Sequence, residues 1–379
     1  MSQKKVSKKQ PFFQTGKIDI TFLSFVLILL SIGLVMLFSA SYAYSYTYFG
    51  NSYRFISRQA IFAVIGVVLM LLISKIDYHI LKKFSWIIYL ATVGMLVLVL
   101  ILPASTELDV KRWLSIGSFS FQPSEIAKFA IVVIFSACLS SNAEKIKKVK
   151  YLAWMVFLLA VVCILVVSEP HLSATVLIFS LGIVLLVVAG LQRRWMVAGV
   201  GVGVGGVAIL IFSGVISYGS DRIAYWLDPW SDPTGKGYQT IQSLLAIGSG
   251  GILGRGIGQS RQKYLWVPEP HNDFIFSIVC EELGLIGAMV IILLFCALIW
   301  RGFTIASRAK DRFGTFLAIG LTFQVGLQAI LNILVVTNTI PNTGISLPFF
   351  SYGGTALVIL LAEMGVVLSV SRSSTVEKI

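Results

Sequence analysis

Long apolar stretches recur along this chain, and most of the intervals between them are only a few residues long. A helix needs about 20 mostly apolar residues to cross the ~30 Å hydrocarbon layer, because it rises ~1.5 Å per residue. Ten stretches meet this length, and they predict an all-α polytopic membrane protein with one ten-helix transmembrane domain over 20–371. The stretches are roughly 20–40, 56–74, 84–103, 122–140, 151–168, 172–190, 195–215, 273–300, 313–336 and 351–371.

Composition excludes the soluble alternatives. Of the 379 residues 57% are hydrophobic and 12% are charged, whereas soluble domains carry roughly a quarter charged residues. Soluble enzymes, fibrous proteins and disordered proteins are therefore excluded. The four cysteines lie in apolar runs without CxxC spacing, so neither disulfides nor zinc are indicated.

The basic residues predict how the chain is oriented. The formal net charge is +13, from 30 Lys and Arg against 17 Asp and Glu. With the N-terminus in the cytoplasm, 20 of the 30 basic residues fall in cytoplasmic segments, as the positive-inside rule requires. We therefore expect cytoplasmic tails at 1–19 and 372–379, with the first apolar run retained as a span rather than cleaved as a signal peptide. The excess charge is then a topology signal, and no nucleic acid partner is expected.

The remaining basic residues gather on the predicted outer face. They lie beside the segment 104–125 and within the loop 216–272, between the seventh and eighth helices. Long loops in a compact protein usually have a function. The outer face is therefore where we expect the functional site.

The segment 111–129 reads KRWLSIGSFSFQPSEIAKF and combines outer cations with a helix start. Glu125 suits the first turn of the fourth helix, and Lys128 follows it on the same face. This pattern fits either a cap with a structural ion pair or a cationic site for a phosphorylated lipid, since ionisable residues within spans are usually functional. The outer cations and the interfacial aromatic residue before this helix are Lys111, Arg112 and Trp113.

A second polar group is the turn SEPHLSAT (168–175), which contains Glu169 and His171. Turn residues are ordinarily polar because they meet water. A turn that is polar only because it meets water is therefore favoured here over a functional site.

The third polar stretch, KYLWVPEPHNDFIFSIVCEELG (263–284), enters the eighth span. Asp273 lies at its water–lipid boundary, where a carboxylate either caps the helix or serves as a partly desolvated base. Glu281 and Glu282 lie ~12 Å deeper along the axis and require a buried cation or a water-filled cavity. The fourth stretch, NTGISLPFFSYGG (342–354), fits either a re-entrant segment or an ordinary loop.

Together these four motifs resemble the SEDS family of cell-shape and division proteins, the FtsW, RodA and SpoVE group. The resemblance covers nearly the whole chain, and EPHLSAT and PEPHNDF look closer to the FtsW and SpoVE branch. It implies a peptidoglycan glycosyltransferase that polymerises lipid II at the outer face of the plasma membrane during division. It also implies a class B penicillin-binding protein and other divisome proteins as partners at the septum.

The resemblance assigns roles to particular residues. Asp273 matches the family's essential Asp, and it would deprotonate the acceptor 4-hydroxyl for an inverting transfer. His171 stands where relatives often carry Asp, so no catalytic role is assigned to it. No metal or other cofactor is expected, because no DxD-type motif is present. The residues expected to bind lipid II or its diphosphate are Arg112, Trp113, Glu125, Lys128, Lys111, Arg255, Arg261, Lys263, His271 and Ser351.

Two other functions use the same residues. A lipid II flippase would take the cationic surface as a headgroup path, and a non-catalytic divisome scaffold would only recruit a transpeptidase. Surface chemistry is favoured over a flippase, because the unusual residues concentrate on one face and the two halves show no matching broken helices. The scaffold ranks third.

Overall fold

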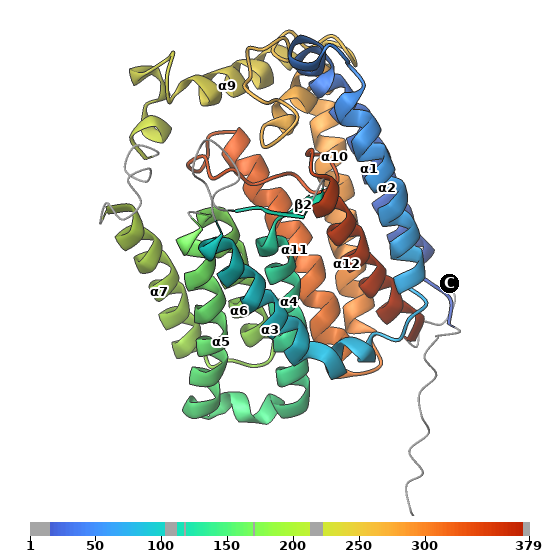
Figure 1. The fold of residues 1–379 in the computed structure, drawn as a ribbon, viewed down its shortest axis with the longest axis vertical. Coiled ribbons are helices and arrows are strands. Elements are labelled where there is room, and N and C mark those ends of the chain that lie inside the picture. Colours follow the sequence, from blue (N-terminus) through green and yellow to red (C-terminus); the bar gives the residue numbers. More distant parts are fainter. Residues whose placement is uncertain (1–15, 103–111, 117–118, 170, 213–222, 374–379) are drawn as a thin grey trace, which may run out of the picture.

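The computed structural model describes residues 16–102, 112–116, 119–169, 171–212 and 223–373. Lys111, most of the two predicted tails and the beginning of the loop 216–272 lie outside these ranges. The described chain is a bundle of long helices, with a layer of loops and short helices across one end (Figure 1).

Ten long helices coincide with the ten predicted stretches. They are α1 (Ile20–Phe49), α2 (Arg54–Ile73), α3 (His79–Ile101), α4 (Pro123–Asn142), α5 (Val149–Ser168), α6 (Leu172–Val188), α7 (Arg193–Phe212), α10 (Ile275–Ser307), α11 (Arg312–Val336) and α12 (Gly354–Ser373). The shorter elements are β1 (Leu114–Ile116), β2 (Phe119–Phe121), η1 (Ala143–Lys147), η2 (Pro229–Ser231) and α9 (Tyr238–Gly250).

Eight of the described helices are long and apolar enough to cross a membrane, and α6 is a shorter apolar helix of 17 residues. The protein is therefore a multi-pass membrane protein. The largest difference from the predicted boundaries is α1, which continues beyond the apolar run as far as Phe49. Helical hydrogen bonding carries on through the serines and tyrosines that follow this run. The helix ends at Gly50, whose φ of 65° suits glycine.

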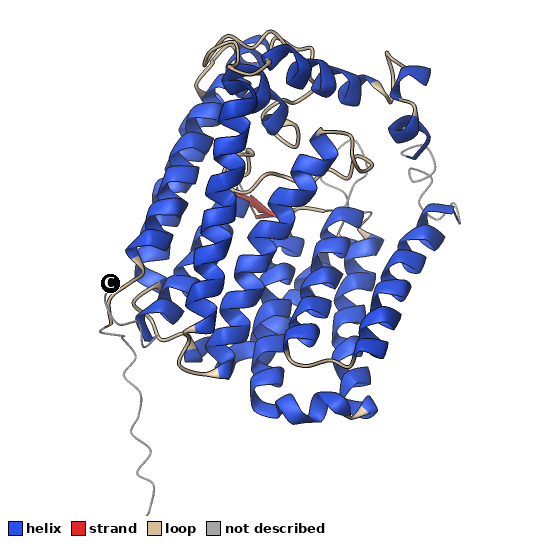
Figure 2. Ribbon diagram, turned by 180° about the vertical axis from the view of Figure 1, so that it is seen from behind, coloured by secondary structure: helices blue, strands red, loops and turns tan. Residues whose placement is uncertain are grey.

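The helices differ in how much of their surface the protein itself covers. In α4, 67% of the most apolar window is buried, and in α2 only 22%. Helix α4 packs against α3, α6 and α11, whereas α2 packs mainly on α12 and α1. Figure 2 shows the helices of the bundle side by side from behind, with the short strands among them. Polar residues on α4 therefore face protein rather than lipid.

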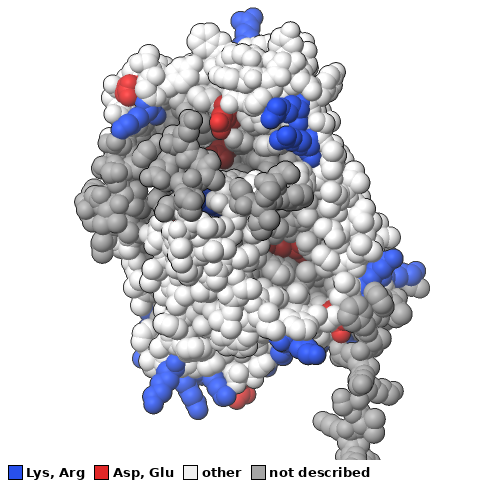
Figure 3. Space-filling model, viewed as in Figure 1, with Lys and Arg blue, Asp and Glu red and all other residues white. Residues whose placement is uncertain are grey.

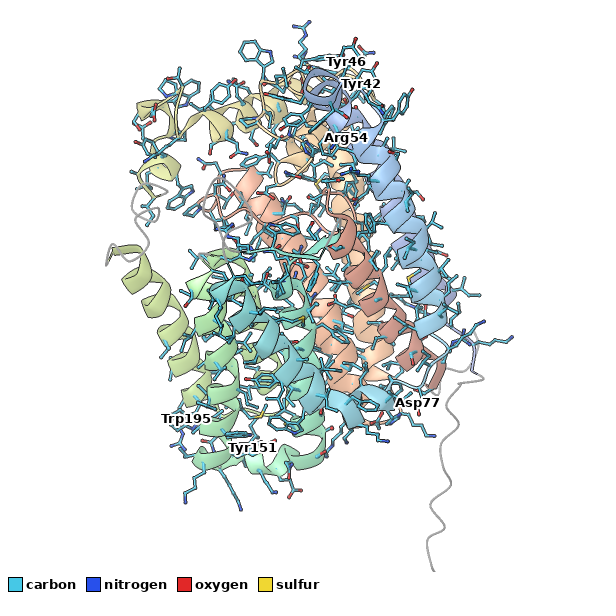
Figure 4. All side chains as sticks on the ribbon, viewed as in Figure 1. Tyr42, Tyr46, Arg54, Asp77, Tyr151 and Trp195 are labelled. Carbon is cyan, nitrogen blue, oxygen red and sulfur yellow. The ribbon has the colours of Figure 1, made fainter. Side chains whose placement is uncertain are left out.

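The bundle has two distinct ends. Tyr42 and Arg54 lie with α9 at what we call the upper end, and Asp77 and Tyr151 lie at the lower end (Figure 4). Lys and Arg side chains lie at both ends of the face shown in Figure 3, with several along its lower edge. The upper half of the same face is hollowed, and acidic side chains are visible within the hollow.

The first and last long helices meet at the lower end. The backbone N–H of Asp19, just before α1, donates to Ser371 Oγ on α12 at 3.1 Å. The same Asp19 carboxylate pairs with Arg301 at the end of α10, at 2.8 Å. The start of α1 and the end of α12 are therefore on the same side of the bundle.

A small hairpin precedes α4, which the expectation of an all-α chain did not include. Strands β1 and β2 are antiparallel, with Leu114 opposite Phe121. Their sequences, LSI and FSF, alternate apolar and polar residues, the period of a half-buried strand. Ser120 O accepts a hydrogen bond from Thr355 on α12, which ties the hairpin to the bundle.

Candidate functional site

Two cavities meet at the upper end of the bundle. The loop cavity has a volume of about 500 Å³ and is lined partly by residues 225–240. The helix cavity has a volume of about 230 Å³ and is lined partly by the first turns of α4. The residues that border both cavities are Arg112, His171, Ser173, Asp273 and Gly344. An acidic and a basic side chain therefore stand at the junction.

The start of α4 supplies a buried cation to the helix cavity. Pro123 begins the helix, where its fixed φ and missing N–H are tolerated. Glu125 in the first turn pairs with Lys128 at 2.8 Å, and the Lys128 ammonium also donates to Gln328 Oε1 at 3.1 Å. Lys128 is only 2% exposed. The two readings of this motif are compatible, because the structural ion pair itself borders the cavity.

Arg112 and Trp113 reach the site from the segment leading into β1. The Arg112 guanidinium donates from Nε to the backbone oxygen of Glu169 at 3.1 Å. This contact joins the hairpin to the turn between α5 and α6. Trp113 borders the helix cavity and is 43% exposed, as expected of an aromatic residue at an interface.

Asp273 is held at the junction through its backbone. Asn332 on α11 is fully buried and donates from Nδ2 to Asp273 O at 2.7 Å and to Ile345 O at 2.6 Å. Gly344 has a φ of 72°, and a Cβ built there would lie 3.3 Å from Asp273 Oδ2. A side chain at Gly344 would be strained and would narrow the space beside the carboxylate.

His271 and Ser351 support the Asp273 loop from behind. Ser351 Oγ donates to Asn272 O at 2.8 Å, and Tyr352 N donates to His271 O at 2.8 Å. The His271 ring packs against Phe55, with centroids 4.3 Å apart. Neither His271 nor Ser351 is among the described residues that line the two cavities. Both side chains support the Asp273 loop in the structure, and their contact with substrate stays a prediction.

The three cations predicted from the long loop do not reach the site. Within the described chain, the lining of both cavities excludes Arg255, Arg261 and Lys263. Lys263 is buried and pairs with Glu282 at 3.0 Å, and Arg255 lies 3.7 Å from Glu281. Arg261 is exposed, and only its backbone N–H contacts Glu281. The interpretation that these cations hold the diphosphate is corrected by their positions.

These contacts also identify the partners of Glu281 and Glu282. We call this group the anchor cluster, and its members are Ser39, Arg255, Ser260, Lys263, Glu281 and Glu282. Ser39 Oγ donates to both oxygens of Glu282, at 2.6 and 2.8 Å. Glu281 accepts from Ser260 Oγ and from the backbone N–H groups of Arg261 and Gln262. One buried cation, Lys263, the partly exposed Arg255 and several N–H and O–H donors satisfy both acids, so they fasten the loop to α10 and α1.

Helix α10 is interrupted next to the anchor cluster. Gly284 has φ 67° and ψ −170° inside the helix, and residues 251–256 fill the break. Arg255 N and Gly256 N donate to the oxygens of Glu281 and Glu282, at 3.0 and 2.9 Å, and Leu285 N donates to Gly251 O at 2.9 Å. A Cβ on Gly284 would lie 2.2 Å from Gly254 N. The docked segment therefore satisfies the backbone groups that the break releases.

Several site residues were missed by the sequence reasoning. Gln328 and Asn332 lie one turn apart in an apolar stretch, and polar residues at i and i+4 on a span are a signal of a shared functional face. Gln328 bridges Lys128 to Ser346, which its Nε2 reaches at 3.1 Å. That spacing could have found both residues. No comparable spacing marked His171.

The turn between α5 and α6 was expected to be polar because it meets water, but its acidic side chain is buried. Glu169 is fully buried, and burial raises the pKa of its carboxyl to about 8, although Arg112 acts to lower it. Burial, with Arg112 and Lys128 nearby, lowers the pKa of His171 to about 3. The favoured reading of this turn is therefore wrong for Glu169. His171 is a neutral ring at the cavity junction.

The chemical capacity of the site follows from these groups. A carboxylate at the junction of two cavities can accept a proton, and two cations beside it can stabilise an oxyanion. The described residues contain no group of three or more His, Cys, Asp or Glu suited to hold a metal ion. Arg112 and Lys128 place fixed positive charge directly on the cavity wall.

Comparison with known proteins extends this picture. The family model described as Cell cycle protein, for FtsW, RodA and SpoVE, matches residues 20–376. The stage V sporulation protein E of Bacillus subtilis (strain 168) is 40% identical over 360 residues, 94% of this chain and 97% of the relative. A probable peptidoglycan glycosyltransferase FtsW of Geobacter sp. (strain M18) is 37% identical over 357 residues, 93% of this chain and 96% of the relative.

Solved structures share the same fold. A chain in a peptidoglycan synthase complex, studied for the coordination of polymerization and crosslinking, has a TM-score of 0.78 and 27% identity. The match covers 94% of this chain and 98% of that one. The rod shape determining protein RodA of Thermus thermophilus has a TM-score of 0.70 at 24% identity, covering 95% and 98%. The helical architecture is therefore that of the RodA fold.

Proposed function

Because the chain belongs to the family of cell cycle proteins that comprises FtsW, RodA and SpoVE, we propose that it polymerises lipid II with Asp273 as general base. The FtsW relatives are described as probable peptidoglycan glycosyltransferases, and this chain is an enzyme of that class. One observation carries the assignment of the base. Asp273, Arg112 and Lys128 border a single cavity at the upper end of the bundle.

The charges of the helix cavity suit the diphosphate of a donor lipid. Arg112 supplies a planar guanidinium and Lys128 a compact ammonium, and both attract phosphate oxygens. Glu125 holds the ammonium in place through its 2.8 Å contact. We assign the donor diphosphate to this cavity.

The loop cavity suits the acceptor saccharide. It is larger, and its lining is rich in groups that bind sugar hydroxyls and stack on sugar rings. The described residues of this kind are Tyr225, Trp226, Tyr238, Gln239, Thr240, Asn338 and Asn342. The acceptor hydroxyl would then approach Asp273 from this side, and the donor sugar from the other.

The transfer balances as one displacement. Asp273 takes the proton of the acceptor 4-hydroxyl, and the oxygen attacks the anomeric carbon of the donor sugar. The bond from that carbon to the diphosphate breaks, and the electron pair leaves with the diphosphate beside Arg112 and Lys128. Attack from the face opposite the leaving group inverts the anomeric carbon.

The finer topology belongs to the same proposal. The domain 20–371 crosses the membrane ten times, both tails are cytoplasmic and the loop 216–272 is outside. The shared side of α1 and α12, and the Lys and Arg at the lower end, support this orientation. The two cavities then open toward the outer leaflet, where lipid II displays its headgroup.

A division-site location and a transpeptidase partner complete the proposal. The structural relative in a synthase complex supports a crosslinking partner, which we take to be a class B penicillin-binding protein. Similarity to FtsW and SpoVE supports the septum as the place of action. Other divisome proteins and membrane lipid are the further contacts that we expect.

Purified protein with lipid II in detergent tests the activity. The wild type should make glycan chains that a muramidase degrades, whereas Asp273→Asn should bind lipid II and make none. Vesicles test the alternative of a flippase, which would move the headgroup across the bilayer without forming polymer. Polymer formed by Asp273→Asn at the wild-type rate would exclude Asp273 as base.

A further inference from the structure

His171 stands at the junction of the two cavities, and the mechanism above does not use it. It directly precedes α6, and the backbone N–H of Thr175 donates to His171 O at 3.2 Å. With Asp273 and Arg112 it is among the described residues that line both spaces. A residue in that position is within reach of a substrate that occupies both cavities.

We propose that His171 is a positioning residue, whose Nε2–H group donates a hydrogen bond to a saccharide oxygen next to the bond being transferred. The proposal rests on the proposed glycosyl transfer and adds a specific contact to it. The ligand chemistry is a hydroxyl or acetamido oxygen of the glycan.

The tautomer of the ring follows from its neighbours. The Gln122 side-chain nitrogen lies 3.0 Å from His171 Nδ1, and an amide nitrogen can only donate. Ser124 Oγ, which is fully buried, lies 3.3 Å from the same atom. The described residues thus place both partners of the ring on Nδ1, which must accept. A neutral ring with Nδ1 as acceptor carries its proton on Nε2.

The ring stays neutral because its surroundings oppose a further positive charge. Burial lowers the pKa of His171 to about 3, and the nearby charges of Arg112 and Lys128 act in the same direction. The acids around it are Asp273, Glu125 and the buried Glu169. The Glu125 carboxylate is paired with Lys128. His171 is therefore a fixed donor at neutral pH rather than a proton carrier.

A neutral donor suits a sugar better than a diphosphate. The negative charge of the leaving group is met by two cations that already border the helix cavity. At the junction itself the substrate atoms are those of the two sugar rings, whose oxygens are uncharged acceptors. A hydrogen bond from a fixed N–H orients such an oxygen and adds no net charge.

Two substitutions separate positioning from structure. His171→Gln retains an N–H donor close to the place of Nε2, whereas His171→Leu removes it. Both remove Nδ1, which Gln122 and Ser124 contact, so the thermal midpoint of each variant is measured beside its activity. We expect His171→Leu to lower kcat/KM by roughly 30-fold and His171→Gln to lower it only a few fold, as for loss of one oriented hydrogen bond.

Two further measurements keep the inference apart from the proposed activity. In an Asp273→Asn background, where turnover is absent, His171→Leu should weaken lipid II binding about tenfold and His171→Gln should not. The pH–rate profile of His171→Gln should keep the wild-type shape between pH 5 and 8.

Three results would overturn the inference. They are equal activity of His171→Leu and wild type, equal damage by Leu and Gln at matched thermal midpoints, and a profile limb near pH 6.5 that vanishes with His171. A wild type that makes no polymer, with His171→Leu still binding more weakly, would instead contradict the proposed activity alone.

Discussion

Asp273 stands just before α10 and Glu281 and Glu282 lie within its first turns, and these two sets of acids have opposite surroundings. Glu281 and Glu282 are buried among serine hydroxyls, backbone N–H groups, Arg255 and Lys263. Asp273 borders two cavities, together with Arg112. The same kind of side chain is enclosed by its own protein in one place and faces a ligand-sized space in the other.

The contrast shows how the role of a carboxylate in a membrane protein can be assigned. Burial alone does not identify a catalytic acid, because Glu281 and Glu282 are the more deeply buried pair. What distinguishes Asp273 is its position on a cavity wall that also carries cations. The following predictions test this distinction, beginning with the largest effect.

Replacing Asp273 by Asn should abolish turnover with little effect on stability. The amide cannot take the acceptor proton, and a general base contributes about 10²–10⁴ to the rate, so we expect a loss of about 10³ in kcat. The backbone contact to Asn332 does not depend on the side chain. Initial rates of lipid II polymerisation and thermal unfolding provide the two measurements. A variant that loses both together would contradict the assignment.

Replacing Lys263 by Ala should lower the stability of the fold without removing the catalytic groups, which is the opposite of the pattern expected for Asp273→Asn. It leaves Glu282 buried without its cation, and breaking a buried pair costs about 3–5 kcal/mol. Thermal or denaturant unfolding in detergent measures the loss.

The matched control removes both charges, as Lys263→Met with Glu282→Leu. Its stability should return toward that of the wild type, with polymerisation close to normal. If the double variant were inactive although folded, the anchor cluster would have a role in the chemistry.

Replacing Lys128 by Ala should reduce kcat/KM by about 10², the effect of losing one donor to a developing oxyanion. Lys128→Arg retains the charge and should recover part of the rate. Single-turnover kinetics with lipid II distinguish the two variants. Equal rates for Ala and wild type would remove the helix cavity as the diphosphate site.

Glu169 should make the stability of the protein depend on pH. Its pKa is about 8 in the folded protein against an ordinary value of 4.5, so between these values the folded state keeps a proton that the unfolded state releases. Stability therefore falls as the pH rises from about 5 to 8, by at most ~1.4 kcal/mol per pH unit. Glu169→Gln should flatten the thermal midpoint against pH over that range. Parallel curves of thermal midpoint against pH for the wild type and Glu169→Gln would refute this.

Removing Arg255 or Arg261 should have the smallest effects. Arg255 is partly exposed and 3.7 Å from Glu281, and such pairs contribute about 0–1 kcal/mol. Arg261 contacts the cluster only through its backbone, which an Ala substitution retains. Polymerisation by each Ala variant should equal that of the wild type. A large loss of polymerisation for either variant would show that the loop cations take part in the site.

The sequence predicted the helices well because spans depend on length and apolarity alone. Each of the ten predicted stretches coincides with a long helix, and the largest boundary differences are at the ends of α1 and α10. The hairpin before α4 was not expected, since six alternating residues are too few to distinguish from an irregular loop. The break at Gly284 was hidden for a different reason. Its backbone groups are satisfied by residues 251–256 of the preceding loop, a pairing that the sequence does not show.

The site was predicted in part. Interactions between residues close in the sequence were predicted, and those between distant residues were not. Glu125 and Lys128 follow from i, i+3 spacing, and both line the helix cavity. Arg255 and Lys263 were misassigned because a sequence shows that a cation is present but not which acid pairs with it. His171 was singled out but given no catalytic role, because relatives often carry Asp there. Its contacts with Gln122 and Ser124, nearly 50 residues away in the chain, could not be read from the sequence.

The docked segment in the α10 break has a mechanical consequence. Detaching residues 251–256 would expose several backbone donors and acceptors at once, at a cost of roughly 1–3 kcal/mol for each one left unsatisfied. We therefore expect this stretch of loop and the first half of α10 to move together. Because Asp273 stands just before α10, such a movement should shift its carboxylate relative to α4.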